Sequence, residues 1–397
     1  MRKNIVTTIA AIAVAAIVIP LPAAASPQLP LPPLTVLTDA AGAGSGDIFI
    51  APVSGNPLYA SGVEILSPNG KKVIWSQQVP GDLSAADFRE QTYQGKPVLT
   101  WWQGTGLGGL ASGVDEIYDA HYHKIAEVHA GNGYTADGHE FLITPWNTAL
   151  ILAYHQSTAD LTSIGGSVHQ AVIDGVVQEI DIATGAVLFQ WDSADHVPYA
   201  QSEQPLPSSP STPWDWFHIN AVKLDGPNLL IDARDTWTAY EISRSTGSIR
   251  WQLGGKDSSF ALRAAPGQQL NDAGEITAWQ HDPEPLGGGN YTFFDNESAG
   301  IANTGTGAVS DFPYSRVVQV HLDFARHTAT LVRSDPQPAG LIASSQGNAQ
   351  AEPGGRTFVG WGALPYLSEF DARGAVVFGA EFPAGVNTYR AYRFPWS

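Results

Sequence analysis

The chain has 397 residues, enough for one large domain or two smaller ones, and only 15% of them are charged. Its formal charge of −18 becomes −20 for residues 27–397, because Arg2 and Lys3 are the only charged residues before position 27. So acidic a surface repels nucleic acid and anionic membranes. The absence of cysteine excludes disulfides, thiol chemistry and cysteine metal sites.

Residues 1–26 have the three regions of a secretory signal peptide: a basic start, an apolar run from Ile5 to Ile19 and small residues at the end. We expect cleavage near Ala25 or Ser26 and a secreted, extracellular protein, free or associated with the cell surface. The alternative is a retained membrane anchor, although the apolar run is short for a span. Residues 27–45 are proline-rich and predict an extended arm.

The stretch from Trp214 to Gly255 predicts four short strands, HINAVKL, NLLIDA, TAYEIS and SIRWQL, separated by turn residues. Four antiparallel strands in about forty residues are typical of one β-propeller blade.

One hairpin pattern recurs along the chain: an apolar strand, a turn, and a second apolar strand that often ends in Trp or Phe. The six copies are marked by Ile65, Ile117, Ile180, Ile242, Val320 and Phe370. Six copies predict an all-β fold, a six-bladed β-propeller over residues 46–397, with four-stranded antiparallel blades around a central channel. The alternative, a pair of β-sandwiches, does not explain a unit repeated six times.

These hairpins are expected to form the outer half of each blade, since inner-strand patterns precede several of them. HEFLITPWNTALILAY, for example, precedes the third hairpin, and RTFVGWGA precedes the sixth. The last segment, TYRAYRFPWS, alternates as a half-buried strand does, so we expect it to pair with the first blade and close the ring. Extra residues near 157–170, 194–213 and 299–311 predict loops on a binding face.

Three histidines occupy equivalent places in successive blades. His139, His218 and His281 each open a predicted innermost strand, and such strands line the channel of a propeller. Arg234 follows His218 by 16 residues, and His155 follows His139 by the same interval. We therefore expect the three imidazoles to converge, with Arg234 near them, as the candidate catalytic residues.

Converging imidazoles and a guanidinium suit a tetrahedral oxyanion, because Arg binds two oxygens and histidine supplies a donor, a proton or a nucleophilic nitrogen. Three histidines would also suit zinc, although a neighbouring arginine opposes a metal, and no metal site is predicted. The remaining alternative is three structural histidines. Nearby acids, Glu140, Asp215 and Asp282, are candidates for fixing the histidine tautomers.

Four further residues form the predicted substrate-binding set. Trp216 and Trp279 each precede a channel histidine by two residues and would wall an aromatic substrate. Asn220 and His155 complete the set.

At these residues the chain resembles the arylsulfotransferase family, in particular its actinobacterial and fungal members. The resemblance spans roughly residues 90–397 and rests on a series of motifs in order: DWFHIN at 215–220, DARDTWTAYEI, IRWQLGGK, WQHD at 279–282, GNAQ at 347–350 and YRAYRFPW at 389–396.

The resemblance implies a six-bladed propeller and transfer of a sulfuryl group from an aryl sulfate to a phenol, without a nucleotide donor or another cofactor. It implies that His281 is transiently sulfated and that His218, Arg234 and His139 bind the sulfuryl group. The expected partners are therefore small aromatic molecules, with no nucleic acid and no membrane insertion after signal cleavage.

The chain also departs from the enterobacterial members of this family. Ala221 stands where those enzymes have serine and Asp235 where they have histidine, and their N-terminal β-domain and disulfide have no counterpart here. An alternative function is a non-catalytic extracellular propeller that binds sulfated or phenolic ligands or cell-wall material.

Overall fold

The computed structural model describes residues 29–106, 110–298 and 312–396. The predicted signal peptide and the predicted loop at 299–311 lie outside the described residues. Among the described residues, regular structure consists of β-strands and short 3-10 helices. No helix in this part of the chain is long and apolar enough to cross a membrane.

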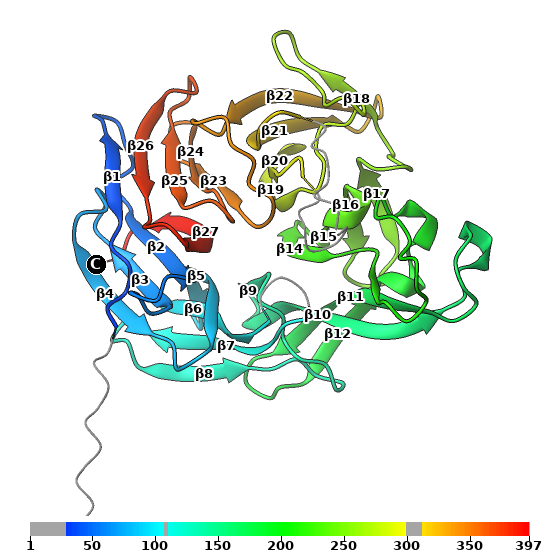
Figure 1. The fold of residues 1–397 in the computed structure, drawn as a ribbon, viewed down its shortest axis with the longest axis horizontal. Coiled ribbons are helices and arrows are strands. Elements are labelled where there is room, and N and C mark those ends of the chain that lie inside the picture. Colours follow the sequence, from blue (N-terminus) through cyan, green and yellow to red (C-terminus); the bar gives the residue numbers. More distant parts are fainter. Residues whose placement is uncertain (1–28, 107–109, 299–311, 397) are drawn as a thin grey trace, which may run out of the picture.

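Six antiparallel sheets surround a central channel, which confirms the predicted six-bladed β-propeller (Figure 1). The strands of each blade are given from the channel outward. Blade 1 has β27 (Val386–Phe394), β2 (Asp47–Ser54), β3 (Gly62–Leu66) and β4 (Val73–Gln78), and blade 2 has β5 (Ser84–Tyr93), β6 (Lys96–Thr105), β7 (Ser112–Asp119) and β8 (Lys124–Val128). Blade 3 has β9 (Phe141–Ile143), β10 (Thr148–Ala159), β11 (Gln170–Asp181) and β12 (Val187–Asp192).

Blades 4 to 6 follow the same order. Blade 4 has β14 (Ile219–Asp225), β15 (Asn228–Ala233), β16 (Thr238–Ser243) and β17 (Ile249–Leu253), and blade 5 has β19 (His281–Gly287), β20 (Asn290–Asp295), β21 (Arg316–Asp323) and β22 (Thr328–Pro336). Blade 6 has β23 (Asn348–Glu352), β24 (Arg356–Gly360), β25 (Tyr366–Phe370) and β26 (Val376–Glu381).

The six predicted hairpins are the third and fourth strands of the six blades, as expected. Three of the described blades carry a fifth strand that the sequence did not indicate. Strand β18 (Ala261–Ala264) runs parallel to β22, β1 (Thr35–Asp39) pairs with β26, and the short strand β13 (Trp214–Asp215) runs parallel to β11. Within residues 29–106, 110–298 and 312–396, four 3-10 helices lie in the connections: η1 (Thr162–Ile164), η2 (Ser193–Asp195), η3 (Tyr199–Gln201) and η4 (Arg234–Thr236).

The two ends of the chain close the ring. The last strand, β27, is the innermost strand of blade 1 and pairs with β2, as Figure 1 shows for the red and blue strands. Strand β1, from the predicted arm, instead covers the outer edge of blade 6. The C-terminal strand thus completes blade 1, and the N-terminal strand extends the neighbouring blade 6.

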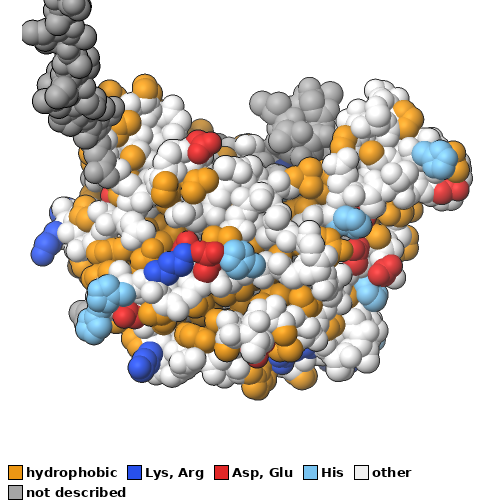
Figure 2. Space-filling model, turned by 90° about the horizontal axis from the view of Figure 1, so that it is seen from below, with side chains coloured by type: hydrophobic (Ala, Val, Ile, Leu, Met, Phe, Trp, Pro, Cys, Tyr) orange, Lys and Arg blue, Asp and Glu red, His pale blue; other side chains and the backbone are white. Residues whose placement is uncertain are grey.

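Each blade packs against its neighbours through apolar side chains, as in the cluster that joins blades 3 and 4 around Trp191, Trp216 and Phe217. The outer strands β4 and β8 consist mostly of exposed and half-buried residues. Figure 2 shows one side of the ring, on which charged, histidine and apolar side chains are scattered. Such a surface agrees with the low proportion of charged residues in the chain.

The same backbone irregularity recurs where three innermost strands begin. Asp87, His218 and Asp282 have positive φ angles of 54°, 51° and 52°, and the strand pairing shifts beside each of them. Positive φ is uncommon for residues with a side chain and is concentrated at functional sites, where bulges redirect side chains. Here it turns side chains toward the channel at one end of the ring.

Candidate functional site

Three imidazole rings from blades 3, 4 and 5 meet at the start of the innermost strands. The ring centre of His139 lies 5.2 Å from that of His218 and 6.4 Å from that of His281. His139 lies two residues before β9, and His218 lies directly before β14. His281 is the first residue of β19. All three are almost completely buried, with 1%, 6% and 1% of their surface exposed.

A polar partner holds the Nδ1 atom of each histidine. His139 Nδ1 contacts Asp137 Oδ1, and His218 Nδ1 lies 2.5 Å from Asp215 Oδ2. His281 Nδ1 lies 2.7 Å from Asn296 Oδ1. Two histidines therefore have a carboxylate partner and the third has an uncharged amide.

Arg234 lies in η4, directly after β15. Its backbone N–H donates to the carbonyl of His218, which places the two residues side by side. The guanidinium lies over the Trp279 ring at 5.2 Å from the ring centre. Its Nη1 donates to Asp235 Oδ1 at 2.8 Å, and its Nη2 donates to the carbonyls of Ser298 and Ser344.

A segment of five residues, Ala343–Gly347, contacts both Arg234 and His281, and we call it the cap segment. The carbonyl of Ser344 accepts from Arg234 Nη2 at 3.2 Å, and the N–H of Gln346 donates to His281 Nε2 at 3.2 Å. Gly347 has a φ of 104°, and a Cβ there would lie 2.6 Å from the Phe294 ring. The cap segment thus has a defined conformation that depends on glycine at 347.

The electrostatic surroundings shift the pKa values of His281 and His218 in opposite directions. Burial lowers the pKa of His281 well below its usual value, and the positive charge of Arg234 lowers it further. Burial also lowers the pKa of His218, but the Asp215 carboxylate more than compensates, so the net shift is upward. Near neutral pH, His281 is therefore an uncharged base, and His218 holds its proton more tightly than an ordinary histidine.

Asp215, His218 and Asp235 present ligand atoms within 4.8 Å of one another, a spacing that would suit a metal ion. The Arg234 guanidinium, however, already contacts Asp235. A cation at this point disfavours a second cation and favours an anion between the imidazoles.

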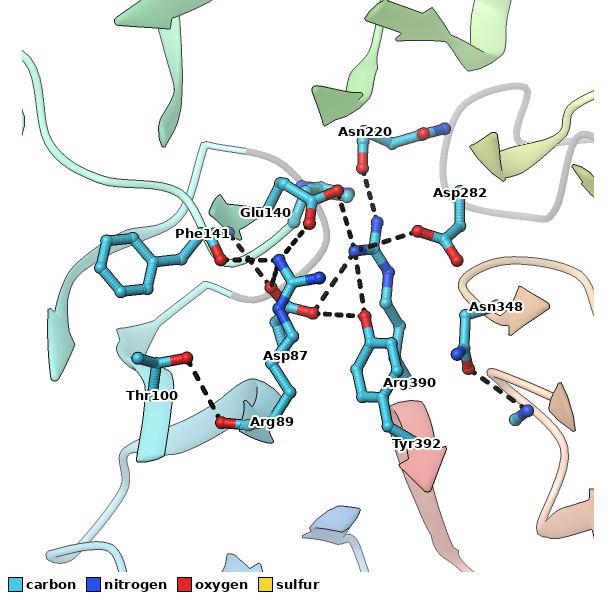
Figure 3. A network of polar contacts seen from close by, with 12 residues as sticks. Asp87, Arg89, Thr100, Glu140, Phe141, Asn220, Asp282, Asn348, Arg390 and Tyr392 are labelled. Carbon is cyan, nitrogen blue, oxygen red and sulfur yellow. Dashed lines mark hydrogen bonds and ion pairs between the residues drawn. The ribbon is translucent and has the colours of Figure 1, made fainter. Parts of the chain in front are cut away.

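Below the histidines, a network of buried ion pairs crosses the channel (Figure 3). Arg390 Nη1 lies 3.0 Å from Glu140 and 3.3 Å from Asp282, and Lys223 Nζ lies 2.9 Å and 2.8 Å from the same two carboxylates. Asp87 and Arg89 extend the network on the blade 2 side. Glu140 and Asp282 therefore serve this network, and neither is the Nδ1 partner of a channel histidine.

A cavity of about 710 Å³ opens at the opposite end of the channel. Its lining residues, such as Thr92, Thr144, Leu286 and Ala351, lie at or just beyond the ends of innermost strands, whereas the histidines lie at their starts. Arg89 of the charged network forms part of its lining, as does Tyr392, whose hydroxyl donates to Asp87 at 2.7 Å. The network thus separates this cavity from the imidazoles.

The predicted substrate-binding residues lie in different places. Trp279 lies beside Arg234, as described. Trp216 is fully buried, with its Nε1 donating to Asp174, and it packs in the core between blades. Asn220 is also fully buried and donates to the carbonyl of Gln280.

His155 is exposed and packs at 5.6 Å from the Tyr134 ring, outside the histidine cluster. Equal spacing did not give equal positions, because β10 continues to Ala159 whereas β15 ends at Ala233 and turns into η4.

Several residues around the cluster were not indicated by the spacing of histidines. They include Asp137, which lies two positions before His139, and the cap segment from the start of blade 6. The rings of Tyr154 and Tyr389 flank His139 at 5.8 Å and 5.5 Å. Tyr389 belongs to the C-terminal motif YRAYRFPW, and this motif was the feature of the sequence that could have indicated it.

Comparison with known proteins gives one family match. Solved structures with limited similarity include a protein of unknown function from Bacteroides caccae, with 12% identity, 88% of this chain and 100% of that chain covered, and a TM-score of 0.49. They also include the glutaminyl cyclase of Myxococcus xanthus, with 13% identity, coverage of 66% and 88%, and a TM-score of 0.29. The Cps50 (Swd1) β-propeller domain of Myceliophteria thermophila has 12% identity, coverage of 87% and 89%, and a TM-score of 0.41.

No curated protein sequence matches the chain. The family model described as arylsulfotransferase (ASST) matches residues 89–383, which include His139, His218, Arg234 and His281. The chain therefore belongs to the arylsulfotransferase (ASST) family.

Proposed function

We propose that the protein transfers a sulfuryl group from an aryl sulfate to a phenolic acceptor through a sulfated His281. The observation that carries this proposal is the meeting of an uncharged imidazole, His281, with Arg234 and two carboxylate-supported histidines in one buried cluster. Membership of the arylsulfotransferase family supports the same reaction class.

In the first half-reaction, the lone pair of His281 Nε2 attacks sulfur and the bond between sulfur and the aryl oxygen breaks. The electron pair of that bond leaves with the phenolate, which takes a proton from the His218 imidazolium. Arg234 and His139 bind the sulfuryl oxygens as their charge is redistributed.

In the second half-reaction, the oxygen of an arriving phenol attacks sulfur while His218 accepts its proton. The nitrogen–sulfur bond breaks and its electron pair returns to Nε2. This covalent route divides one displacement into two and predicts ping-pong kinetics.

The cap segment bears directly on the first step. The Gln346 N–H donates to the same Nε2 lone pair that would attack sulfur, and the Ser344 carbonyl occupies one donor of Arg234. Binding of an aryl sulfate therefore requires these two hydrogen bonds to be exchanged for contacts with the sulfate.

The test is release of yellow 4-nitrophenolate from 4-nitrophenyl sulfate in the presence of phenol. Wild type is expected to release the product and His281→Ala is not. His155→Ala is the matched control, since it removes an exposed imidazole outside the cluster. Brief exposure to the donor should add about 80 Da to the peptide that contains His281.

Two other functions remain distinguishable in the same experiments. Equal blanks for wild type and His281→Ala, together with measurable binding of an aryl sulfate, would favour a non-catalytic binding propeller. A metal-dependent hydrolase is the other candidate, because ligand atoms of Asp215, His218 and Asp235 lie within 4.8 Å of one another, although the Arg234 cation opposes a metal there. That function requires stoichiometric metal in the purified protein and loss of hydrolysis after chelation.

We further propose that this activity is located outside the cell, because residues 1–26 have the pattern of a secretory signal peptide. Sequencing the N-terminus of the protein recovered from the culture medium would test both export and the cleavage site near Ala25 or Ser26.

A further inference from the structure

We propose that Asn296 is a positioning residue that holds His281 in the neutral tautomer with the proton on Nδ1 and the lone pair on Nε2. The inference deepens the proposed function, because it depends on His281 being the nucleophile for its role in the reaction. It concerns which nitrogen attacks and what keeps that nitrogen unprotonated.

The orientation of the Asn296 amide follows from its own partners. Asn296 Nδ2 donates to the carbonyl of Ala343 at 2.8 Å and to the carbonyl of Gln346 at 3.0 Å. Carbonyl oxygens only accept, so the –NH₂ group must face them. The oxygen Oδ1 therefore faces His281.

That orientation fixes the proton on one ring nitrogen. Asn296 Oδ1 only accepts, and it lies 2.7 Å from His281 Nδ1, so Nδ1 must carry the hydrogen. The backbone N–H of Gln346 only donates, and it points at Nε2 from 3.2 Å, so Nε2 must be without one. Both contacts agree on a single tautomer.

Asn296 is itself firmly held. Its side chain is completely buried, and its backbone carbonyl accepts from Ser315 Oγ at 2.8 Å. Ser315 Oγ also accepts from the backbone N–H of Ala343 in the cap segment. Asn296 therefore joins the end of β20, His281 and the cap segment in one hydrogen-bonded unit.

An amide at this position differs functionally from the carboxylates that serve the other two histidines. A carboxylate beside Nδ1 stabilises the imidazolium, which has no lone pair on Nε2. An amide oxygen orients the ring without adding charge. The groups facing His281 from the other blades are Arg234, His139 and His218, and their positive charge also opposes protonation of His281.

The first test observes the tautomer directly and does not depend on catalysis. Protein labelled with ¹⁵N at histidine is examined by long-range ¹H–¹⁵N correlation spectra, with His281→Ala identifying one of the 11 histidine spin systems. We expect a protonated Nδ1 and an unprotonated Nε2 at neutral pH. A protonated Nε2, or an imidazolium, overturns the proposal.

The second test uses the pH dependence of kcat/KM for 4-nitrophenyl sulfate. Asn296→Asp adds a carboxylate of the same shape and is expected to move the acidic limb of the profile upward by about one pH unit or more. Asn296→Leu removes the acceptor and is expected to lower kcat about 100-fold, with a smaller effect on KM. An acidic limb that stays in place in Asn296→Asp contradicts the proposal.

Asn387→Ala is the matched control. Asn387 Nδ2 donates to Gln346 Oε1 at 3.3 Å, so it supports the cap segment without touching His281. Its pH profile should match that of wild type, and a shift equal to that of Asn296→Asp would mean that the cap, not the amide, sets the titration. If wild type shows the expected tautomer but no turnover, the assignment of the tautomer to Asn296 stands and the proposed reaction fails.

Discussion

Arg234 Nη1 lies 2.8 Å from Asp235 Oδ1, so the guanidinium proposed to bind sulfate already has an anionic neighbour in the chain. Both side chains are buried, with 3% and 0% exposed, so water screens their interaction little. The carboxylate competes with an incoming sulfate for the same cation. Asp235, which the sequence comparison marked as a departure, is therefore expected to weaken donor binding.

Replacing Asp235 with Asn removes this competing charge and keeps the size of the side chain. We expect the KM for 4-nitrophenyl sulfate to fall about fivefold to tenfold, equivalent to about 1–1.4 kcal/mol. Asp272→Asn makes the same charge change at an exposed position and should leave KM unchanged. A higher KM in Asp235→Asn would show that the carboxylate serves mainly to orient Arg234.

We expect the ion pair between His218 and Asp215 to set the alkaline limb in the pH profile of kcat/KM. The folded pKa of His218 is raised, so the imidazolium persists above its usual range and is lost as the pH rises through that pKa. If His218 protonates the leaving phenolate, kcat/KM falls over the same interval. The stabilisation from this ion pair is complete below the unfolded pKa and disappears over the same rise.

Asp215→Asn removes the carboxylate that raises this pKa, so the alkaline limb should move to lower pH by about one unit. The measurement is kcat/KM against pH, with a donor whose phenol leaving group ionises well above the limb, so that its departure needs the proton. A limb that does not move would assign the titration to another group.

The repeated hairpins made the propeller predictable, since each pairs an apolar strand with turn residues and each lies in the outer half of a blade. The alternation in TYRAYRFPWS likewise predicted the strand that closes the ring. The arm was predicted only as extended chain. Its pairing with β26 was not predictable, because pairing depends on the edge that the rest of the fold leaves open.

At the site, strand-opening histidines predicted the meeting of His139, His218 and His281, because equivalent places in adjacent blades lie at one depth. Regular spacing failed for His155, where β10 continues as a strand. It also gave no indication of the positive φ angles at His218 and Asp282, or of the cap segment, which reaches His281 from another blade. These features arise from tertiary packing and not from local pattern.

Replacing Arg393 is expected to lower stability strongly, because this residue takes part in closing the ring. Its Nε lies 3.0 Å from Glu369 Oε2, with both side chains completely buried, and this pair joins blade 1 to blade 6. Arg393→Met leaves the Glu369 carboxylate buried with one cation fewer, so we expect the free energy of unfolding to fall by about 3–5 kcal/mol. Urea unfolding followed by tryptophan fluorescence measures the change.

Arg326→Met is the matched control, because Arg326 pairs with Asp323 on the surface and is 79% exposed. It should cost less than about 1 kcal/mol. The double variant Arg393→Met with Glu369→Met should recover part of the loss. Equal losses for Arg393→Met and Arg326→Met would show that the buried pair does not fasten the ring.

The two tyrosines beside His139 predict opposite effects of losing a hydroxyl group. Tyr154 Oη donates to the Ile219 carbonyl at 2.5 Å, whereas the buried Tyr389 hydroxyl has no hydrogen-bond partner among the described residues. Tyr154→Phe should therefore lower the free energy of unfolding by about 1–3 kcal/mol, and Tyr389→Phe should leave it unchanged or raise it by about 1 kcal/mol. Urea unfolding of the two variants in parallel tests this difference, and a comparable loss in both would mean that a buried water satisfies the Tyr389 hydroxyl.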